Sequence, residues 1–120
     1  MTFQRKRLGS KGEEAAAQYL KKKGFSVLCR NYTCVIGEID LIALDKGVIV
    51  FVEVRSRSGD GYGLAQESIT KRKQHKLRQL ASYYLLAEGK TGSDCRFDVI
   101  AILFEGEGGI KTLDHIKNAF

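Results

Sequence analysis

The sequence predicts an α/β fold in which a mixed β-sheet is flanked by helices, in the order α-β-β-β-α-β-β. Two segments, near residues 10–24 and 70–88, carry apolar residues at helical spacing, and five others alternate or run apolar over strand lengths. The second helix falls between the third and fourth strands, which implies a right-handed parallel crossover within the sheet. A chain of 120 residues fits a single domain over residues 1–120.

The first helix is expected to begin near Ser10. The stretch "SKGE" has the form of a capping box, in which the Ser10 side chain bonds forward and Glu13 reaches back to the Ser10 amide. An alanine-rich apolar stripe follows, and "KKKG" ends the helix at Gly24, where lysines suit the negative end of the helix dipole. Glu13 shares the face of that stripe and is therefore expected to point toward the sheet.

The remaining elements follow from strand alternation and turn signals. "FSVLCRNY" alternates as a strand, and residues 36–44 and 48–55 form two more strands around the "DKG" turn. A loop rich in Gly and Ser, "SRSGDGYG", precedes a second helix that Thr70 caps and that runs to about Glu88. "CRFDVIAILF" reads as a buried strand and "GGIKTLDHI" as a final edge strand.

The charge balance favours a polyanionic partner. The net charge is +6 and the sequence pI is near 9.3, values that suit a polyanion such as nucleic acid. The cations gather in two clusters that we expect to hold phosphates: Arg5, Lys6 and Arg7 near the N-terminus, and Lys71, Arg72, Lys73 and Lys76 at the start of the second helix.

The chain also lacks the marks of secretion, of membrane insertion and of a zinc site. Its N-terminal residues are basic and polar, and its longest apolar run, "GVIVFV", is too short to span a bilayer. Three widely spaced cysteines fit reduced thiols, and they do not show the spacing of zinc ligands. These features predict a cytoplasmic protein with no membrane partner.

The most apolar part of the chain, "GEIDLIALDKGVIVFVEVRSR", contains an unexpected concentration of charge. If Lys46-Gly47 is a two-residue hairpin loop, the register places Asp40 opposite Glu53, and Glu38 opposite Arg55. Directly opposed residues have Cβ atoms roughly 4.5–5.5 Å apart. Two carboxylates at that distance repel by roughly 3 kcal/mol at an effective dielectric constant near 20.

Two interpretations of these charges remain open at the level of sequence. In one, Glu38 and Arg55 form a cross-strand ion pair on a solvated face, with Asp40 and Glu53 exposed beside them. In the other, the carboxylates hold a divalent metal, because hard oxygen ligands suit Mg²⁺ or Mn²⁺. A strand as continuously apolar as "VIVFVEV" is expected to be covered on both faces, so acids within it need a reason.

Several segments resemble known nucleases. "GEIDLIA" followed by "FVEVRSR" looks like the acid…(D/E)-x-K signature of the restriction-endonuclease-like superfamily. The segments "GSKGEEAAAQYLKKKGF", "RNYTCVIGEIDLIA", "RFDVIAI" and "HIKNAF" resemble the YraN family of small bacterial proteins, which is related by motif to archaeal Holliday-junction resolvases. The resemblance implies a restriction-endonuclease-like core, metal-dependent hydrolysis of DNA phosphodiester bonds, with branched DNA as a candidate substrate, and a resolvase-like homodimer.

The resemblance also assigns roles to individual residues. It makes Asp40 and Glu53 ligands of Mg²⁺ or Mn²⁺, Glu38 a further ligand or the partner of Arg55, and Glu13 the additional acid of the resolvases. For Glu13 the capping role is an equal alternative.

Arg55 departs from the superfamily pattern, which has lysine at this position. Arginine stays protonated and cannot act as a general base, although it can orient water or stabilise developing charge. A non-catalytic nucleic-acid-binding module with a nuclease-like fold therefore remains the alternative function.

Overall fold

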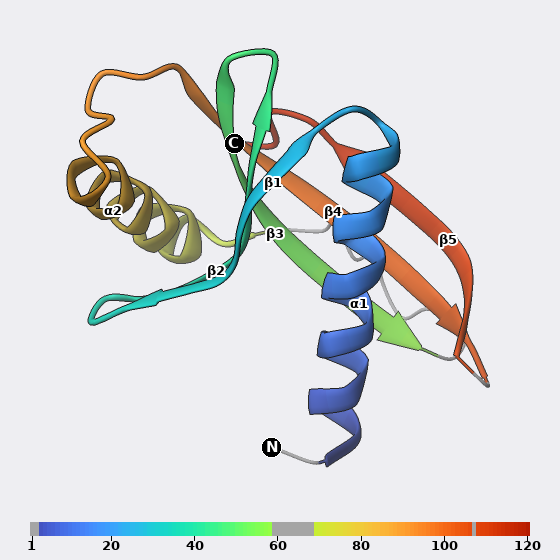
Figure 1. The fold of residues 1–120 in the computed structure, drawn as a ribbon. Helices are drawn as coiled ribbons and strands as arrows, with labels where there is room; N and C mark the ends of the chain where they lie inside the picture. Colours follow the sequence, from blue (N-terminus) through green and yellow to red (C-terminus); the bar gives the residue numbers. More distant parts are fainter. Residues whose placement is uncertain (1–2, 59–68, 107) are drawn as a thin grey trace.

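The element order expected from the sequence is confirmed in the computed structural model, which describes residues 3–58, 69–106 and 108–120, with side chains from residue 9 onward (Figure 1). The elements are α1 (Phe3–Lys22), β1 (Ser26–Cys34), β2 (Gly37–Asp45), β3 (Val48–Ser58), α2 (Lys71–Ala87), β4 (Cys95–Glu105) and β5 (Gly109–Ile116). Ser56 to Ser58, expected at the start of the Gly/Ser-rich loop, extend β3 instead, and the rest of that loop lies outside the described residues.

The five strands form one mixed sheet in the order β1-β2-β3-β4-β5 (Figure 1). The β3–β4 pair is parallel and the other three pairs are antiparallel. The segment containing α2 connects the two parallel strands, as a parallel crossover requires. β5 forms one edge of the sheet, as expected from its polar sequence, and β1 forms the other.

Each helix covers one face of this sheet. Ala16, Ala17 and Leu20 of α1 pack in one cluster with alternate residues of the central strands, such as Val50 and Val52 of β3. Residues of the opposite parity, such as Phe51, pack with α2 in the other cluster, whose helical members are Leu77, Leu80, Ala81 and Tyr84. The period of two in the strands therefore decides which helix each strand residue meets.

The first helix begins earlier than the sequence suggests. α1 starts at Phe3, so Ser10 lies inside the helix and the predicted capping box at Ser10 is wrong. Gln, Arg, Lys and Leu dominate residues 4–8, and these residue types all favour helix. With no proline to stop it, the helix runs through Gly9 and Ser10.

A glycine lets α1 approach the central strand closely. Gly12 is buried, and a Cβ placed on it would collide with Oγ of Ser56 and lie 3.2 Å from Cβ of Ser56 on β3. The Ser56 Oγ is itself buried and has no hydrogen-bond partner among the described residues. This contact fixes the height of α1 above the strand that carries Glu53 and Arg55.

A buried carboxylate ties the C-terminal segment to the sheet. Asp98 on β4 is fully buried; its oxygens accept hydrogen bonds from Arg96 Nε (2.9 Å) and from the backbone N–H of Asn118 (3.0 Å), and pair with His115 Nε2 (2.7 Å). Burial by itself would raise the pKa of Asp98, but the bonds to His115, Arg96 and Asn118 lower it below its ordinary value. His115 also meets the hydroxyl of Tyr19 on α1 at 3.1 Å, so the cluster links both ends of the chain.

Within the described residues, no helix is both long enough and apolar enough to cross a bilayer.

We predict that the contact at Gly12 limits stability. Gly12→Ala should lower the free energy of unfolding by about 1–3 kcal/mol, as overpacked sites do, because the new Cβ would collide with Oγ of Ser56 and lie only 3.2 Å from its Cβ. Gly9→Ala is the matched control in the same helix, since no described atom lies within 4 Å of its new Cβ. It should raise stability by up to about 1 kcal/mol, the helix-propensity gain of alanine. Urea unfolding measures both, and equal stabilisation by the two variants would contradict the packing argument.

Candidate functional site

The predicted hairpin register is confirmed over its first half. β2 and β3 pair antiparallel from Asp45↔Val48 to Leu41↔Val52. Lys46 and Gly47 both have positive φ, 50° and 86°, which a two-residue turn of this hand requires. Beyond Leu41 the paired positions end, and the β1–β2 hairpin turns away from β3 (Figure 1). β2 and β3 therefore separate after the pair Leu41↔Val52, and we call this point the fork. Asp40 is the residue of β2 that lies at its base.

The alternation of β2 breaks at the same point. Strand alternation would put Ile39 and Leu41 on one face of the sheet, but Ile39 packs in the cluster under α2 and Leu41 in the cluster under α1. On β1, Asn31 lies between the pairs Arg30↔Leu41 and Tyr32↔Ile39 and has a left-handed backbone with φ of 52°. Asparagine tolerates this conformation better than most residues. The irregular backbone on both strands frees Asp40 from a regular ladder position.

Asp40 and Glu53 lie near each other at the fork, although the paired positions end at Leu41↔Val52, before the cross-strand pair that the hairpin register predicts. The backbone N–H of Val54 donates to Asp40 Oδ2 at 2.8 Å, and Glu53 is 8% exposed. Burial first, and the charge of Glu53 second, raise the pKa of Asp40 to about 7, although the Val54 hydrogen bond opposes this shift. The interpretation in which both acids are solvated is therefore wrong for this pair.

A lysine from α2 completes the charge arrangement. Lys73 Nζ lies 3.0 Å from Glu53 Oε2. The Thr70 cap expected from the sequence is confirmed, because Thr70 Oγ1 accepts a hydrogen bond from the Lys73 backbone N–H at 3.1 Å. That cap begins α2 at the position from which the side chain of Lys73 reaches β3.

A polar pocket opens beside this pair. Its volume is about 400 Å³. The residues that line it are Glu53, Val54, Arg55, Ser56, Arg57, Ile69, Thr70 and Lys73. Three of them are cations and one is the buried Glu53, so the pocket suits a phosphate group approaching beside the carboxylates.

The other two predicted acids, Glu13 and Glu38, lie outside the pair formed by Asp40 and Glu53. Burial raises the pKa of Glu13, a side-chain hydrogen bond from Asn31 opposes this, and the charges of Glu38 and Glu53 raise it further. Glu13 thus points toward the site from α1. Glu38 is exposed on β2, where it pairs with Thr33 of β1 and accepts a 3.5 Å hydrogen bond from Thr33 Oγ1.

The expected pair of Glu38 and Arg55 does not form. Because β2 leaves β3 after Leu41, Glu38 has moved to the β1 side of the fork, and no ion pair joins it to Arg55 in the described part of the chain. Arg55 instead lines the pocket beside Glu53. The ion-pair interpretation of the charged hairpin is therefore wrong.

The converging acids fit a metal site made of two carboxylates. Among residues 3–58, 69–106 and 108–120, no three His, Cys, Asp or Glu side chains gather closely enough to hold a metal by themselves. Mg²⁺ is usually held by only one or two carboxylates together with water and substrate phosphates. The pair of the half-buried Asp40 and the buried Glu53, with its mutual repulsion and hard oxygen donors, fits that pattern.

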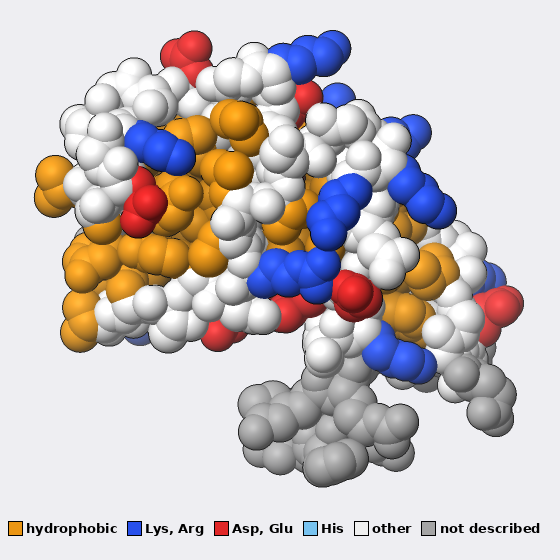
Figure 2. Space-filling model, in the orientation of Figure 1, with side chains coloured by type: hydrophobic (Ala, Val, Ile, Leu, Met, Phe, Trp, Pro, Cys, Tyr) orange, Lys and Arg blue, Asp and Glu red, His pale blue; other side chains and the backbone are white. Residues whose placement is uncertain are grey.

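The basic cluster on α2 borders the site. Lys71 and Arg72 are exposed in the first turn of the helix, and Lys76 lies over Gly37 at the start of β2, where its Cε would be 3.0 Å from an added Cβ. Figure 2, in which α1 lies in front of the sheet as in Figure 1, shows Lys and Arg side chains beside acidic ones near the middle of the α1 side and a hydrophobic area toward α2. The side chains of the second cluster, Arg5, Lys6 and Arg7, lie outside the described residues; their backbone is in α1.

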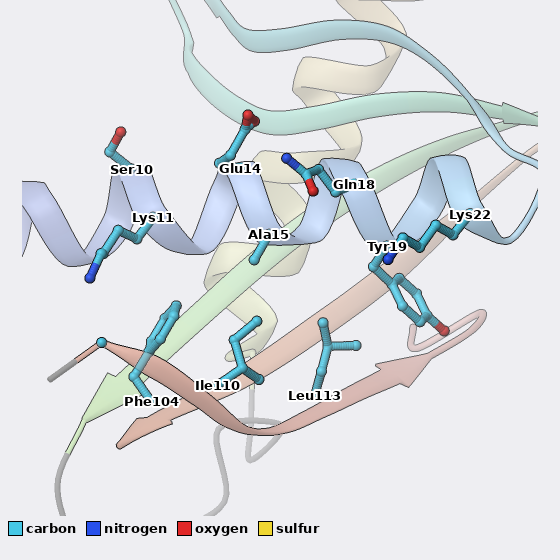
Figure 3. Close-up of a pocket in the computed structure, with 11 residues that line it drawn as sticks. Ser10, Lys11, Glu14, Ala15, Gln18, Tyr19, Lys22, Phe104, Ile110 and Leu113 are labelled. Atoms are coloured by element: carbon cyan, nitrogen blue, oxygen red, sulfur yellow. The ribbon is translucent and has the colours of Figure 1, made fainter. Parts of the chain in front are cut away.

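Another pocket is larger but lacks this chemistry. It has a volume of about 570 Å³ and lies between α1 and β5, where Phe104, Ile110 and Leu113 point toward the helix (Figure 3). Lys11 and Lys22 stand at its rim, and none of the residues predicted to form the site lines it. By size alone, this larger pocket would be the candidate binding site. The acidic and basic side chains that converge at Glu53 make the smaller pocket the better candidate.

Sequence reasoning missed three residues at the site: Asn31, Ser56 and Arg57. Arg57 could have been found, because a period of two puts it on the same face as Glu53 and Arg55. Ser56 and Asn31 gave no such signal. Ser56 matters through its contact with Gly12, and Asn31 because its side chain near Glu13 opposes the rise in the Glu13 pKa.

The fold and the site together define a small α/β protein in which a buried carboxylate, Glu53, and a half-buried one, Asp40, meet a group of cations beside an open pocket. A family profile described as "Uncharacterised protein family UPF0102" matches residues 12–102. The chain belongs to this family, which is the YraN-like group that its motifs resemble.

Full-length relatives support the same assignment. A UPF0102 protein of Pelotomaculum thermopropionicum is 61% identical over 120 residues, covering all of both chains. The UPF0102 protein of Desulforamulus reducens is 50% identical over 121 residues and covers 99% of each chain. The one from Moorella thermoacetica is 46% identical over 120 residues, again covering both chains fully.

The raised pKa of Asp40 predicts a pH-dependent stability in metal-free protein. The folded pKa of about 7 lies above the ordinary 3.8, so the contribution of this group is fully present below pH 4 and is lost as pH rises to about 7. Asp40→Asn should reduce the stability lost between these pH values by more than about 1.4 kcal/mol, the equivalent of one pKa unit. Urea unfolding at several pH values in EDTA measures this.

The exposed Asp114 on β5 offers a control with the same chemical change. Asp114→Asn should keep the pH profile of the unmodified protein. If Asp40→Asn has that same profile as well, the like-charge pair of Asp40 and Glu53 does not govern the pH dependence of stability.

Proposed function

We propose that this protein is a metal-dependent phosphodiesterase that cleaves DNA, with branched DNA as the substrate that the resolvase resemblance favours. The observation that supports it most is the meeting of the half-buried Asp40 with the buried Glu53, whose negative charges repel each other when both are ionised. Such an arrangement costs stability and needs a compensating function. Mg²⁺ or Mn²⁺ is the cation we propose.

In this proposal the carboxylates hold the metal and the arginines of the pocket stabilise negative charge. Asp40 is held in place by the Val54 N–H and Glu53 by burial, so both present oxygens without large rearrangement. A metal bound there would polarise the scissile phosphate and lower the pKa of an attacking water. Arg55 and Arg57 line the same pocket and would stabilise the charge that develops on the phosphate.

The basic residues outside the pocket would hold the DNA backbone. Lys71, Arg72 and Lys76 are exposed along the start of α2, next to the pocket, and contacts of this kind position phosphates without reading sequence. Arg5, Lys6 and Arg7 are assigned the same role from sequence alone. A homodimer would present two such sites, as symmetric cleavage of a branched substrate requires.

One feature of the site favours the second candidate, a nucleic-acid-binding module that does not cleave. Arginine stands at position 55, where the superfamily has lysine, and arginine cannot exchange a proton near neutral pH. The same cations would then bind phosphates with no chemistry following.

Cleavage of a DNA panel tests the proposal. Linear, flapped and four-way DNAs incubated with Mg²⁺ or Mn²⁺ should be cut by the unmodified protein and not in EDTA. Asp40→Ala or Glu53→Ala should lower the rate by at least about 100-fold, because each removes a ligand that positions the reacting groups. Asp114→Ala, on the exposed face of β5, should cleave normally.

Binding measurements distinguish the outcomes. Calorimetric titration with Mn²⁺ should show binding that both site variants lose while circular dichroism shows an intact fold. DNA binding without cleavage under any metal condition would establish the second candidate instead. Equal Mn²⁺ binding by the unmodified protein and both variants would reject the metal site.

The salt dependence of DNA binding tests the basic surface. Replacing Lys71, Arg72 and Lys76 together with Gln should weaken binding and lower the slope of log affinity against log salt by up to about 3, since fewer counterions are released. Lys46→Gln with Lys90→Gln, which lie at the β2–β3 turn and beyond the end of α2, should leave the slope unchanged. An unchanged slope in the triple variant would make the cluster an ordinary solvated helix face.

A further inference from the structure

The amine nearest the paired acids does not come from the strand. The superfamily pattern puts its lysine two residues after the second acid, the position that Arg55 occupies here. In the structure, the cation in contact with Glu53 is Lys73 of α2, with Nζ 3.0 Å from Glu53 Oε2. Among the described residues Arg55 makes no ion pair, and the Arg57 guanidinium donates to the Ser56 carbonyl at 3.2 Å.

We propose that Lys73 is an exchangeable counterion of the site: it neutralises Glu53 in the metal-free protein and transfers to a DNA phosphate when a divalent metal binds. The inference rests on the proposed function and names the residue that couples its metal to its DNA. Lys73 thereby supplies from a helix the amine that the superfamily supplies from the strand.

The surroundings of Lys73 suit such an exchange. Its backbone is fixed, because its N–H is bonded to Thr70 Oγ1 in the first turn of α2. Its side chain is 48% exposed, whereas that of Glu53 is 9% exposed, so the amine can leave while the carboxylate stays. Lys73 also lines the 400 Å³ pocket together with Arg55 and Arg57, where a phosphate would be received by all three cations.

Charge decides the direction of the coupling. A lysine ammonium and a divalent ion compete for the same carboxylate, so Lys73 disfavours metal as long as it stays on Glu53. A phosphate in the pocket offers the ammonium another anion and removes this competition. DNA should therefore strengthen metal binding, and metal should strengthen DNA binding to the same extent.

The test is Mn²⁺ affinity measured by calorimetry, with and without a short duplex DNA. Without DNA, Lys73→Gln should bind Mn²⁺ roughly tenfold more tightly than the unmodified protein, because the competing charge is gone. Lys73→Arg, which keeps the charge, should stay close to the unmodified protein. The gain in Mn²⁺ affinity that DNA gives the unmodified protein should be reduced in Lys73→Gln.

Lys90→Gln controls for the loss of one positive charge, because Lys90 lies beyond the far end of α2. It should leave Mn²⁺ affinity unchanged. Unchanged or weaker Mn²⁺ binding by Lys73→Gln, while the unmodified protein binds the metal, would overturn the counterion role alone. Absence of Mn²⁺ binding by the unmodified protein would overturn the metal site and this inference together, whereas metal binding without cleavage would leave the inference intact and reject only the nuclease.

Discussion

The separation of β2 from β3 is the constraint on which the candidate site depends. A continuous ladder would have used the Val54 N–H in a backbone hydrogen bond and placed Asp40 as one more side chain on a flat face. At the fork that N–H donates to the Asp40 carboxylate at 2.8 Å, so the side chain takes the place of a strand partner. The buried N–H is satisfied, and a carboxylate is held at the edge of the core beside Glu53.

The two helices add a charged side chain to the site from each face of the sheet: Glu13 from α1 and Lys73 from α2. α1 sits close to β3 because Gly12 has no side chain, and this brings Glu13 and its Asn31 partner toward the acids from one side. α2 begins at its Thr70 cap and places Lys73 over Glu53 from the other side. The site is thus assembled from three layers, and the spacing of each layer is fixed by a local feature of the sequence.

The sequence predicted best what depends on local rules. The element order, the Lys46-Gly47 turn, the register that follows from it and the Thr70 cap all rest on periodicity or turn chemistry, and the structure has each of them. The expectation failed where a long-range contact overrides the local pattern. A strict period of two placed Glu38 opposite Arg55, but the ladder ends before that position because β1 and β2 bend away together.

Segments that this chain shares with its family also hold the fold together. "RFDVIAI" and "HIKNAF" meet through Asp98, His115 and the Asn118 N–H, in a buried cluster that ties the C-terminal segment to β4 and, through Tyr19, to α1. Its carboxylate is matched by Arg96, so its pKa is lowered; the Asp40 carboxylate lacks such a match, so its pKa is raised. The two aspartates therefore differ in their surroundings: Asp98 is fully buried and matched by His115, Arg96 and the Asn118 N–H, whereas the half-buried Asp40 accepts one backbone hydrogen bond beside a second carboxylate, Glu53.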